Sequence, residues 1–537
     1  MPTRTSGTNP AHRRRALDPG TASQSGPSAP GLPSRRAVLA GAVTAAASTW
    51  LLAACDAGHT ARDAVAAAPP GAVTLALTAP PANLDFTTTS GAAIPQALMG
   101  NVYEGLVAVN DDGELVPALA SAWSVDEGGT RYTFELQKGV RFSNGDEFSS
   151  ATVKFSLERV NTDAWTNGLK AGMALLERVE TPDPLTAVAV LKRPSLAWLR
   201  SLATLIGAMF TPSAVTGLKG SAVGTGPFEV SSWKPGQSLA LTRRADYWGE
   251  PAASPQVTLR YYADNTTAVN ALRGGAVDAV VGLASPELLA PFEKNPEYRI
   301  TQGTSTGEVV LSMNNQAAPF TDVRVRQAVM YGVDRAGVLA SAYDGRGTLI
   351  GAPVPPTAPY FEDLTGAYPY NPARATELLK EAGVYGTTVT FSVPDLPYAV
   401  AASQAVASDL TKVGLKVKIK VQEFPAVWLQ EVLTAHRFQL SVIAHVEPDD
   451  LLTLLSSGYY LGYDGARVAS IAAAADAGDT REYIAGMREV VRQAIVEDAA
   501  ADTLFLLPAL SLMRASLRGL PVNSPTTALE LSRVVKA

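Results

Sequence analysis

From Ala72 onward the chain alternates short strand patterns with amphipathic helical patterns, and this alternation restricts the fold more than any other feature of the sequence. Runs of alternating or β-branched residues predict strands at 72–77, 131–136, 256–262 and 415–423. Apolar residues at helical spacing predict helices at 150–160, 322–334 and 371–383. The strands are too scattered for a sandwich, and no period of about 20 to 50 residues repeats. The pattern therefore indicates an α/β or α+β protein.

Two glycine turns join elements early in the chain. Residues 104–117 read as a hairpin closed at Asp112-Gly113. Asn144-Gly145 predicts a turn between a short strand at 140–142 and the helix that begins at residue 150. Both turns have a structural role, so we expect no ligand contacts on them.

The only cysteine, Cys55, ends a stretch that is typical of an export signal. A basic pair, Arg35 and Arg36, precedes eighteen uncharged residues from Ala37 to Ala54. The run from Leu52 to Cys55 resembles the lipobox of bacterial lipoproteins, in which the signal is cut before the cysteine and the thiol receives a diacylglycerol. A single membrane-spanning helix is the alternative, because eighteen uncharged residues are nearly enough to cross a bilayer.

The basic pair resembles a twin-arginine signal, with a Sec route left open. We predict a signal peptide with a lipobox at 1–54, lipidation at Cys55, an export signal at Arg35 and Arg36, and a flexible tether at 55–71. Lipidation would hold the protein at the extracytoplasmic face of the cell membrane. After Cys55 no apolar run reaches eighteen residues, which favours a soluble body.

The charge of the chain argues against nucleic acid as a partner. Residues 1–54 carry six of the 44 Lys and Arg residues and one of the 50 Asp and Glu residues. A chain cut before Cys55 is therefore strongly acidic, whereas phosphate neutralisation requires clustered Lys and Arg.

The sequence offers little to catalysis or to metal binding. Residues 303–307 match the G-x-S-x-G pattern of a hydrolase nucleophile, Ser305, but extended runs flank the pattern on both sides instead of a strand and a helix. With one cysteine and four histidines in the chain, a metal site has few candidate ligands. We expect no enzyme activity, no catalytic residue, no metal and no cofactor.

Residues 101–160 resemble the signature of the family 5 extracellular solute-binding proteins, the peptide-binding components of ABC importers. Matching blocks follow in order along nearly the whole body: "YEGL" at 103, "PALA" at 117, "YTFEL" at 132, "GVRFSNGDEF" at 139, "GTGPFEV" at 224, "RRADYWG" at 243, "PFTDVRVRQAVMYGVDR" at 319 and "NPARATELLKEAG" at 371.

The resemblance implies an α/β, two-lobed fold of the large periplasmic-binding-protein type, with an accessory subdomain and a hinge around a central cleft. Lobe one would combine 72–107, 220–303 and 514–537, with the accessory subdomain at 108–219. Lobe two would span 304–513. The chain would cross between the lobes near 303–306 and near 510–516, where small residues can absorb dihedral change.

The resemblance also implies where a ligand binds. Peptide-binding members hold the ligand backbone and capture its ammonium with a carboxylate in a lobe-two loop that follows a strand. The loop here runs from Ala444 to Asp450, and Glu447 is the candidate ammonium partner. For His445 itself, a ligand contact and a buried, satisfied histidine both remain open. Further contacts are expected from residues of both lobes: Phe86, Thr87, Thr88, Gly303, Thr304, Ser305, Asn314 and Tyr459.

The resemblance implies a monomeric, lipid-anchored binding protein that captures peptides or a similar small polar solute and delivers it to ABC permease subunits with cytoplasmic ATPases. Two alternatives stay open. One is a different cargo on the same fold, such as a nickel chelate, an opine, a sugar or haem. The other is a sensory or chaperone-like lipoprotein that is not coupled to import.

Overall fold

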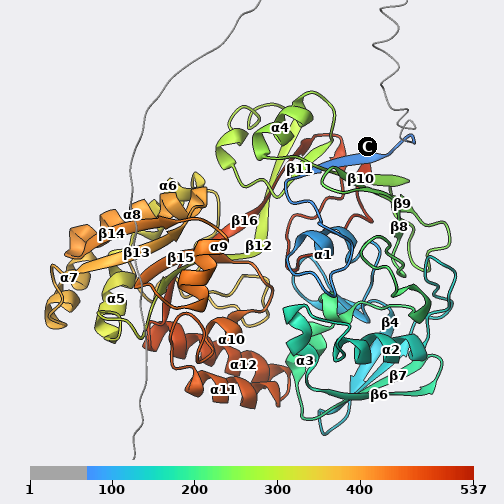
Figure 1. The fold of residues 1–537 in the computed structure, drawn as a ribbon, viewed down its shortest axis with the longest axis horizontal. Coiled ribbons are helices and arrows are strands. Elements are labelled where there is room, and N and C mark those ends of the chain that lie inside the picture. Colours follow the sequence, from blue (N-terminus) through green and yellow to red (C-terminus); the bar gives the residue numbers. More distant parts are fainter. Residues whose placement is uncertain (1–68) are drawn as a thin grey trace, which may run out of the picture. The chain divides into compact units, whose positions relative to one another are not determined.

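A computed structural model describes residues 69–537, and its framework is a ten-stranded mixed sheet (Figure 1). The sheet order is β14 (Lys416–Gln422), β13 (Thr388–Pro394), β15 (Leu440–His445), β12 (Tyr298–Met313), β16 (Ala501–Arg514), β11 (Ala279–Val281), β1 (Val73–Leu77), β10 (Gln256–Tyr261), β9 (Ser238–Arg243) and β8 (Phe228–Lys234).

The two longest strands, β12 and β16, join the two halves of this sheet. They pair antiparallel along most of their length, and the register shifts between Thr304 and Glu308. Beyond the shift, β12 pairs with β15, whereas the other end of β16 pairs with β11. Two long antiparallel strands therefore connect both halves.

The buried apolar residues form two large cores. The first runs from Val73 in β1 to Val534 and includes a four-stranded sheet of β4 (Ala120–Val125), β5 (Arg131–Leu136), β7 (Thr186–Leu191) and β6 (Leu176–Asp183). The second runs from Val309 in β12 to Phe505 in β16. We call the bodies around these cores lobe one and lobe two. A small third core packs α4 (Asn265–Arg273) against β11 and β16.

The helices connect the strands along the chain and pack against the sheets. In lobe one they are α1 (Ala93–Leu98), α2 (Ser150–Val160) and α3 (Leu196–Ser201). In lobe two they are α5 (Val323–Gly332), α6 (Arg335–Tyr343), α7 (Pro372–Glu381), α8 (Pro397–Val413), α9 (Ala426–Trp428), α10 (Leu451–Leu454), α11 (Ala466–Asp476) and α12 (Thr480–Val491). Two-stranded pairs join β2 (Val107–Val109) to β3 (Leu115–Pro117) and β17 (Leu517–Arg518) to β18 (Val535–Lys536).

The predicted strands and helices are confirmed where their local pattern is strong. The four predicted strands are β1, β5, β10 and β14, and the three predicted helices are α2, α5 and α7. Helix α7 begins as expected, because the Asn371 side chain accepts a hydrogen bond from the Arg374 amide at 3.0 Å, with Pro372 in the first turn.

One predicted strand, at 140–142, is wrong. Only an isolated bridge between Arg141 and Glu147 forms there. The predicted turn is present, with Gly145 at φ +89°, and it folds the short segment back on itself. The few residues on either side leave no room for a ladder, so the segment is part of a tight loop.

The β2–β3 hairpin is confirmed, and its turn reaches lobe two. The Asn110 side chain accepts hydrogen bonds from the Asp112 and Glu114 amides, and Gly113 has φ +85°. A Cβ atom at Gly113 would lie 1.9 Å from the Thr357 carbonyl oxygen of lobe two. Glycine is therefore required where the hairpin touches the opposite lobe.

Candidate ligand-binding site

A pocket of about 370 Å³ is lined by residues of both lobes. This volume lies in the range of small-molecule sites. Lobe one contributes the loop before α1, a short 3₁₀ helix, the turn after α3 and a C-terminal segment: Ser90, Gly91, Ala92, Pro95, Met99, Asn167, Gly168, Leu169, Ala203, Thr204, Leu205, Thr526, Thr527 and Ala528. Lobe two contributes Glu447, Pro448, Asp449, Asp450, Thr453 and Tyr459.

The lobe-two wall is an acidic loop at the end of a strand. Strand β15 ends at His445 and α10 begins at Leu451, so the loop projects Glu447, Asp449 and Asp450 towards the pocket. Ends of strands in α/β sheets are places where loops carry ligand contacts. Partial burial raises the pKa of the Glu447 carboxyl, and the charge of Asp450 adds to this rise. A ligand cation would relieve both effects.

His445 lies behind this wall and does not line the pocket. Its Nδ1 atom lies 3.0 Å from Asp450 Oδ2, and its Nε2 atom lies 2.9 Å from the Tyr460 hydroxyl. The imidazole also stacks on the Tyr460 ring. Of the two interpretations of His445, the structure supports the buried, satisfied histidine, because neither ring nitrogen is free for a ligand.

Glu308 is a second buried acid beside the loop. It stands in register with His445 on the neighbouring strand and is 4% exposed. Its Oε2 atom has no hydrogen-bond partner among the described residues. Burial, reinforced by Asp450 and Asp449, raises the pKa of Glu308 to about 9. The carboxyl is therefore protonated at neutral pH, a state that the sequence did not indicate.

Comparison with known proteins identifies the family. The model of the bacterial extracellular solute-binding proteins, family 5 (middle region), matches residues 114–457, which is more than half of the chain. The chain belongs to this family. The matched range includes Glu447 and ends just before Tyr459, so it contains most of the lobe-two wall of the pocket.

Among curated relatives of this solute-binding protein is the glutathione-binding protein GsiB of Escherichia coli (strain K12). The two are 30% identical over 341 residues, which are 62% of this chain and 65% of the relative. The match therefore spans slightly less than two thirds of the curated relative.

Solved structures show the fold. DppA from Helicobacter pylori, in complex with the peptide STSA, matches with a TM-score of 0.72 at 22% identity, over 87% of this chain and 98% of that one. NikZ from Campylobacter jejuni, in complex with Ni(L-His), matches with a TM-score of 0.72 at 19% identity, over 87% and 100%. The protein has the same α/β, two-lobed fold, and that fold holds chemically different ligands.

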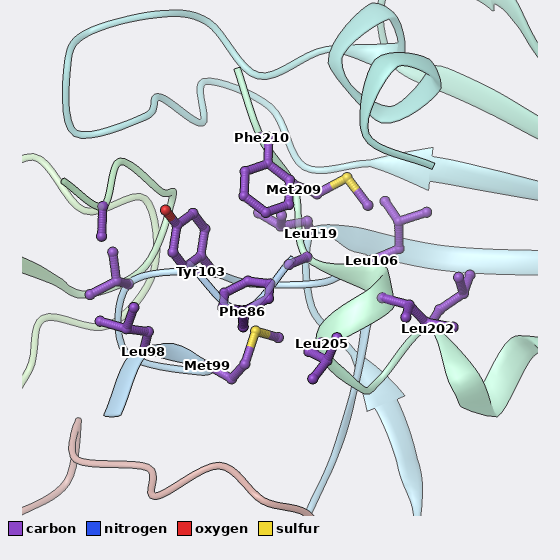
Figure 2. Packing of buried hydrophobic residues seen from close by; sticks show 14 of the residues in the cluster. Phe86, Leu98, Met99, Tyr103, Leu106, Leu119, Leu202, Leu205, Met209 and Phe210 are labelled. Atoms are coloured by element: carbon purple, nitrogen blue, oxygen red, sulfur yellow. The ribbon is translucent and has the colours of Figure 1, made fainter. Parts of the chain in front are cut away.

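The predicted lobe-one contacts Phe86, Thr87 and Thr88 do not line the pocket. Phe86 is 1% exposed and packs in the lobe-one core, with its ring centroid 5.3 Å from Tyr103 and 5.9 Å from Phe210 (Figure 2). The Thr87 and Thr88 hydroxyls both donate to the Asp85 carboxylate. The structure thus assigns this loop a structural role, and the pocket is lined instead by the residues that follow, beginning at Ser90.

The backbone at 303–304 is occupied by the C-terminal segment. A Cβ atom at Gly303 would lie 1.9 Å from the Val522 carbonyl oxygen. The Thr304 amide donates to Asn523 Oδ1 at 2.8 Å, and the Thr304 carbonyl accepts from the Ser524 amide at 2.8 Å. Neither residue lines the pocket, because the C-terminal segment packs against Gly303 and uses the backbone groups of Thr304.

Ser305 and Asn314 are also structural. The Ser305 hydroxyl donates to the Leu507 carbonyl at 2.5 Å, within β12 and far from the strand–turn–helix that a nucleophile elbow requires. The Asn314 side chain donates to the His436 and Phe438 carbonyls and is 5% exposed. Their hydrogen-bonding groups are already paired inside the protein.

Two predicted contacts, Glu447 and Tyr459, do line the pocket. Tyr459 is half-buried and meets the ring of Tyr460 edge-on, with centroids 5.1 Å apart. The larger omission was the C-terminal wall at Thr526–Ala528, which carries small residues with no periodic pattern. The Asn101 side chain holds this segment, since it donates to the Leu529 carbonyl and accepts from the Leu531 amide.

Two ion pairs join the lobes, and one of them involves Asp449 of the pocket wall. Arg200 Nε donates to Asp449 Oδ2 at 3.0 Å, and Arg193 Nη1 donates to Asp476 Oδ2 at 3.0 Å. Asp476 also accepts from the Ala197 amide at the start of α3. These contacts link α3 to the acidic loop and to α11.

Within residues 69–537 the structure shows no cluster of three His, Cys, Asp or Glu side chains arranged to hold a metal ion. In the same range no helix is long and apolar enough to cross a membrane. The predicted signal peptide and lipobox at 1–54, and Cys55 itself, lie outside the described residues.

Proposed function

We propose that the protein is the substrate-binding component of an ABC importer. It captures a peptide or a similar small polar solute in the pocket between the lobes and delivers it to a membrane permease. The family, the two-lobed fold and the pocket shared between lobes support this role. The chemistry is binding alone, because the relatives are binding proteins by name and Ser305 is not placed as a nucleophile.

The observation that carries the proposal is the position of Glu447. It lies on the pocket wall, and no described residue donates a hydrogen bond to its carboxylate in the structure. An accessible carboxylate on the pocket wall with no partner among the described residues is suited to receive a ligand ammonium. The acid also stands in the loop after β15, where the family resemblance places such a group.

Closure of the lobes around the solute would follow from the difference in contacts between open and closed states. The Arg200–Asp449 and Arg193–Asp476 pairs exist only while the lobes are together. We propose that the lobes hinge where β12 and β16 connect them, near 303–306 and 510–516, with lobe one at 72–107, 220–303 and 514–537, its subdomain at 108–219, and lobe two at 304–513.

Replacing Glu447 with alanine is expected to weaken the binding of an N-terminally unblocked ligand by about 1.5 to 3 kcal/mol, as for the loss of a charged hydrogen bond. Titration calorimetry measures the change. Glu489→Gln is the control, because Glu489 is an exposed acid of α12 outside the pocket. An unchanged affinity in Glu447→Ala would remove Glu447 from the site.

The native ligand is best identified from the protein itself. Mass spectrometry of small molecules released by denaturing freshly purified protein tests the proposal directly, since a closed pocket retains its cargo. A peptide or another amine in stoichiometric amount supports the proposal. A released sugar or haem would contradict it.

We further propose that Cys55 is lipidated and holds the protein at the extracytoplasmic face of the membrane. Two acyl chains give lasting attachment where one chain does not. Cys55→Ser is expected to move the protein from the membrane fraction to the soluble fraction. If Cys55→Ser stayed in the membrane fraction, the spanning-helix interpretation of residues 37–54 would replace the lipid anchor.

A further inference from the structure

We infer that the pocket selects solutes that carry a positive charge and no free carboxylate, such as amines or peptides with an amidated carboxyl end. This inference rests on the proposed function, in which the pocket captures its solute through Glu447. It adds the charge class of the cargo, which the family and the fold leave open.

The charge inventory of the pocket is one-sided. Among the described residues that line it, three are acids, Glu447, Asp449 and Asp450, and none is Lys, Arg or His. The remaining polar lining groups are neutral hydroxyls and an amide, such as Ser90, Asn167 and Thr204. Asp449 pairs with Arg200 and Asp450 with His445, which leaves Glu447 as the unpaired acid of the wall. A ligand carboxylate would meet this acid and no free cation among the lining residues, and such like-charge contacts are disfavoured.

Arg200, the cation that pairs with the lining residue Asp449, is already engaged inside the protein. Arg200 donates through Nε to Asp449 at 3.0 Å and through Nη1 to the Gly113 carbonyl at 2.9 Å. Its side chain is 14% exposed. Using Arg200 to bind a ligand carboxylate would break one of the contacts that join the lobes, so this guanidinium is not a free anion site.

A second acid stands behind the wall without a partner. Glu308 is 4% exposed, its Oε2 atom is unpaired, and it shares the face of the sheet that carries His445. Burial and the charges of Asp450 and Asp449 keep this carboxyl protonated at neutral pH, so it adds no negative charge to the wall. The charge selection therefore rests on the acids that line the pocket.

The adjoining space is acidic too. A side pocket of about 260 Å³ shares Met99, Ala203, Thr526 and Ala528 with the ligand pocket. Its charged lining residues are Glu104, Glu250 and Glu530, and no described lining residue is basic. A ligand that extends past the shared wall therefore meets carboxylates again, and a negative charge at its far end would not strengthen its binding.

The test offers the protein an equimolar library of tripeptides, each present as the free acid and as the carboxyl amide. Mass spectrometry of the bound fraction gives the ratio of the two forms. We expect amides to be enriched at least about fivefold over the matching acids, and calorimetry on the best pair should reproduce this ratio. The N-acetyl form of the best amide, which lacks the ammonium, should lose binding.

Asp449→Asn tests the origin of the preference. It removes one acid from the wall and leaves Arg200 without its carboxylate, so the amide preference should shrink towards parity. Glu489→Gln changes the net charge equally but outside the pocket, and it should keep the preference. Thermal unfolding of both variants checks that they fold.

The outcomes separate the two proposals. Equal or tighter binding of the free acids, with binding still lost on N-acetylation, overturns the charge selection and leaves capture through Glu447 intact. Failure of every peptide in the library to bind, with no other amine released from the purified protein, contradicts the proposed function, and this inference with it. An amide preference that Glu489→Gln reduces as much as Asp449→Asn does also overturns the inference, because general charge would then be its cause.

Discussion

Gly303→Ala is expected to lower the free energy of unfolding by about 3 kcal/mol or more, because the added methyl meets backbone that has no room to move. The ideal Cβ lies 1.9 Å from the Val522 carbonyl oxygen and 2.5 Å from its carbon. Relief requires the C-terminal segment to leave β12, which would break both hydrogen bonds of Thr304 to residues 523–524. Urea or thermal unfolding measures the loss.

The same substitution should also remove ligand binding at temperatures where the protein stays folded. The segment displaced by a methyl at Gly303 leads directly to Thr526–Ala528, which forms a wall of the pocket. Gly307→Ala on the same strand is the matched control, since its Cβ would lie 3.2 Å from the flexible Leu507 side chain. If the Gly303→Ala protein were as stable as the Gly307→Ala protein and kept full affinity, the close contact between β12 and the C-terminal segment would not have the role given to it here.

Local patterns explain why much of the fold was predictable. Helix α7 follows from its Asn cap, its first-turn proline and its apolar spacing, all within thirteen residues. The acidic loop was found because a buried strand, β15, ends in a cluster of carboxylates. Glu447 and Tyr459 could therefore be placed near a ligand by position along the chain and by family resemblance.

Long-range contacts explain what the sequence did not predict. Whether Thr304 faces a ligand or another strand depends on Asn523, which lies 219 positions away in the chain. Phe86 and Asn314 are buried by partners that no local pattern identifies. The pocket wall at Thr526–Ala528 consists of small residues. A hydrogen bond from the Asn101 side chain to the Leu529 carbonyl holds the neighbouring residues and so brings this wall to the site.

Glu308 should make the protein less stable as the pH rises, and Glu308→Gln should remove much of this dependence. In the folded protein, burial and the charges of Asp450 and Asp449 raise the pKa of Glu308 to about 9. The unfolded chain releases this proton near pH 4.5, so the folded state binds more protons between these values. Stability therefore falls as the pH rises through this window, by an upper value of about 4 kcal/mol between pH 5 and pH 8.

The groups that face Glu308 make the comparison specific. Asp449 and Asp450 come from the loop after β15, His445 lies in register on β15, and Arg200 approaches Asp449 from α3. Urea unfolding at pH 5 and pH 8 should show a smaller stability difference in Glu308→Gln than in the original protein. Other buried carboxyls, such as Asp502, whose pKa is raised to about 6 by burial, stay the same in both proteins and cancel. An identical pH dependence in both would mean that Glu308 is ionised in the folded state, and the acid behind the pocket wall would then carry a full negative charge.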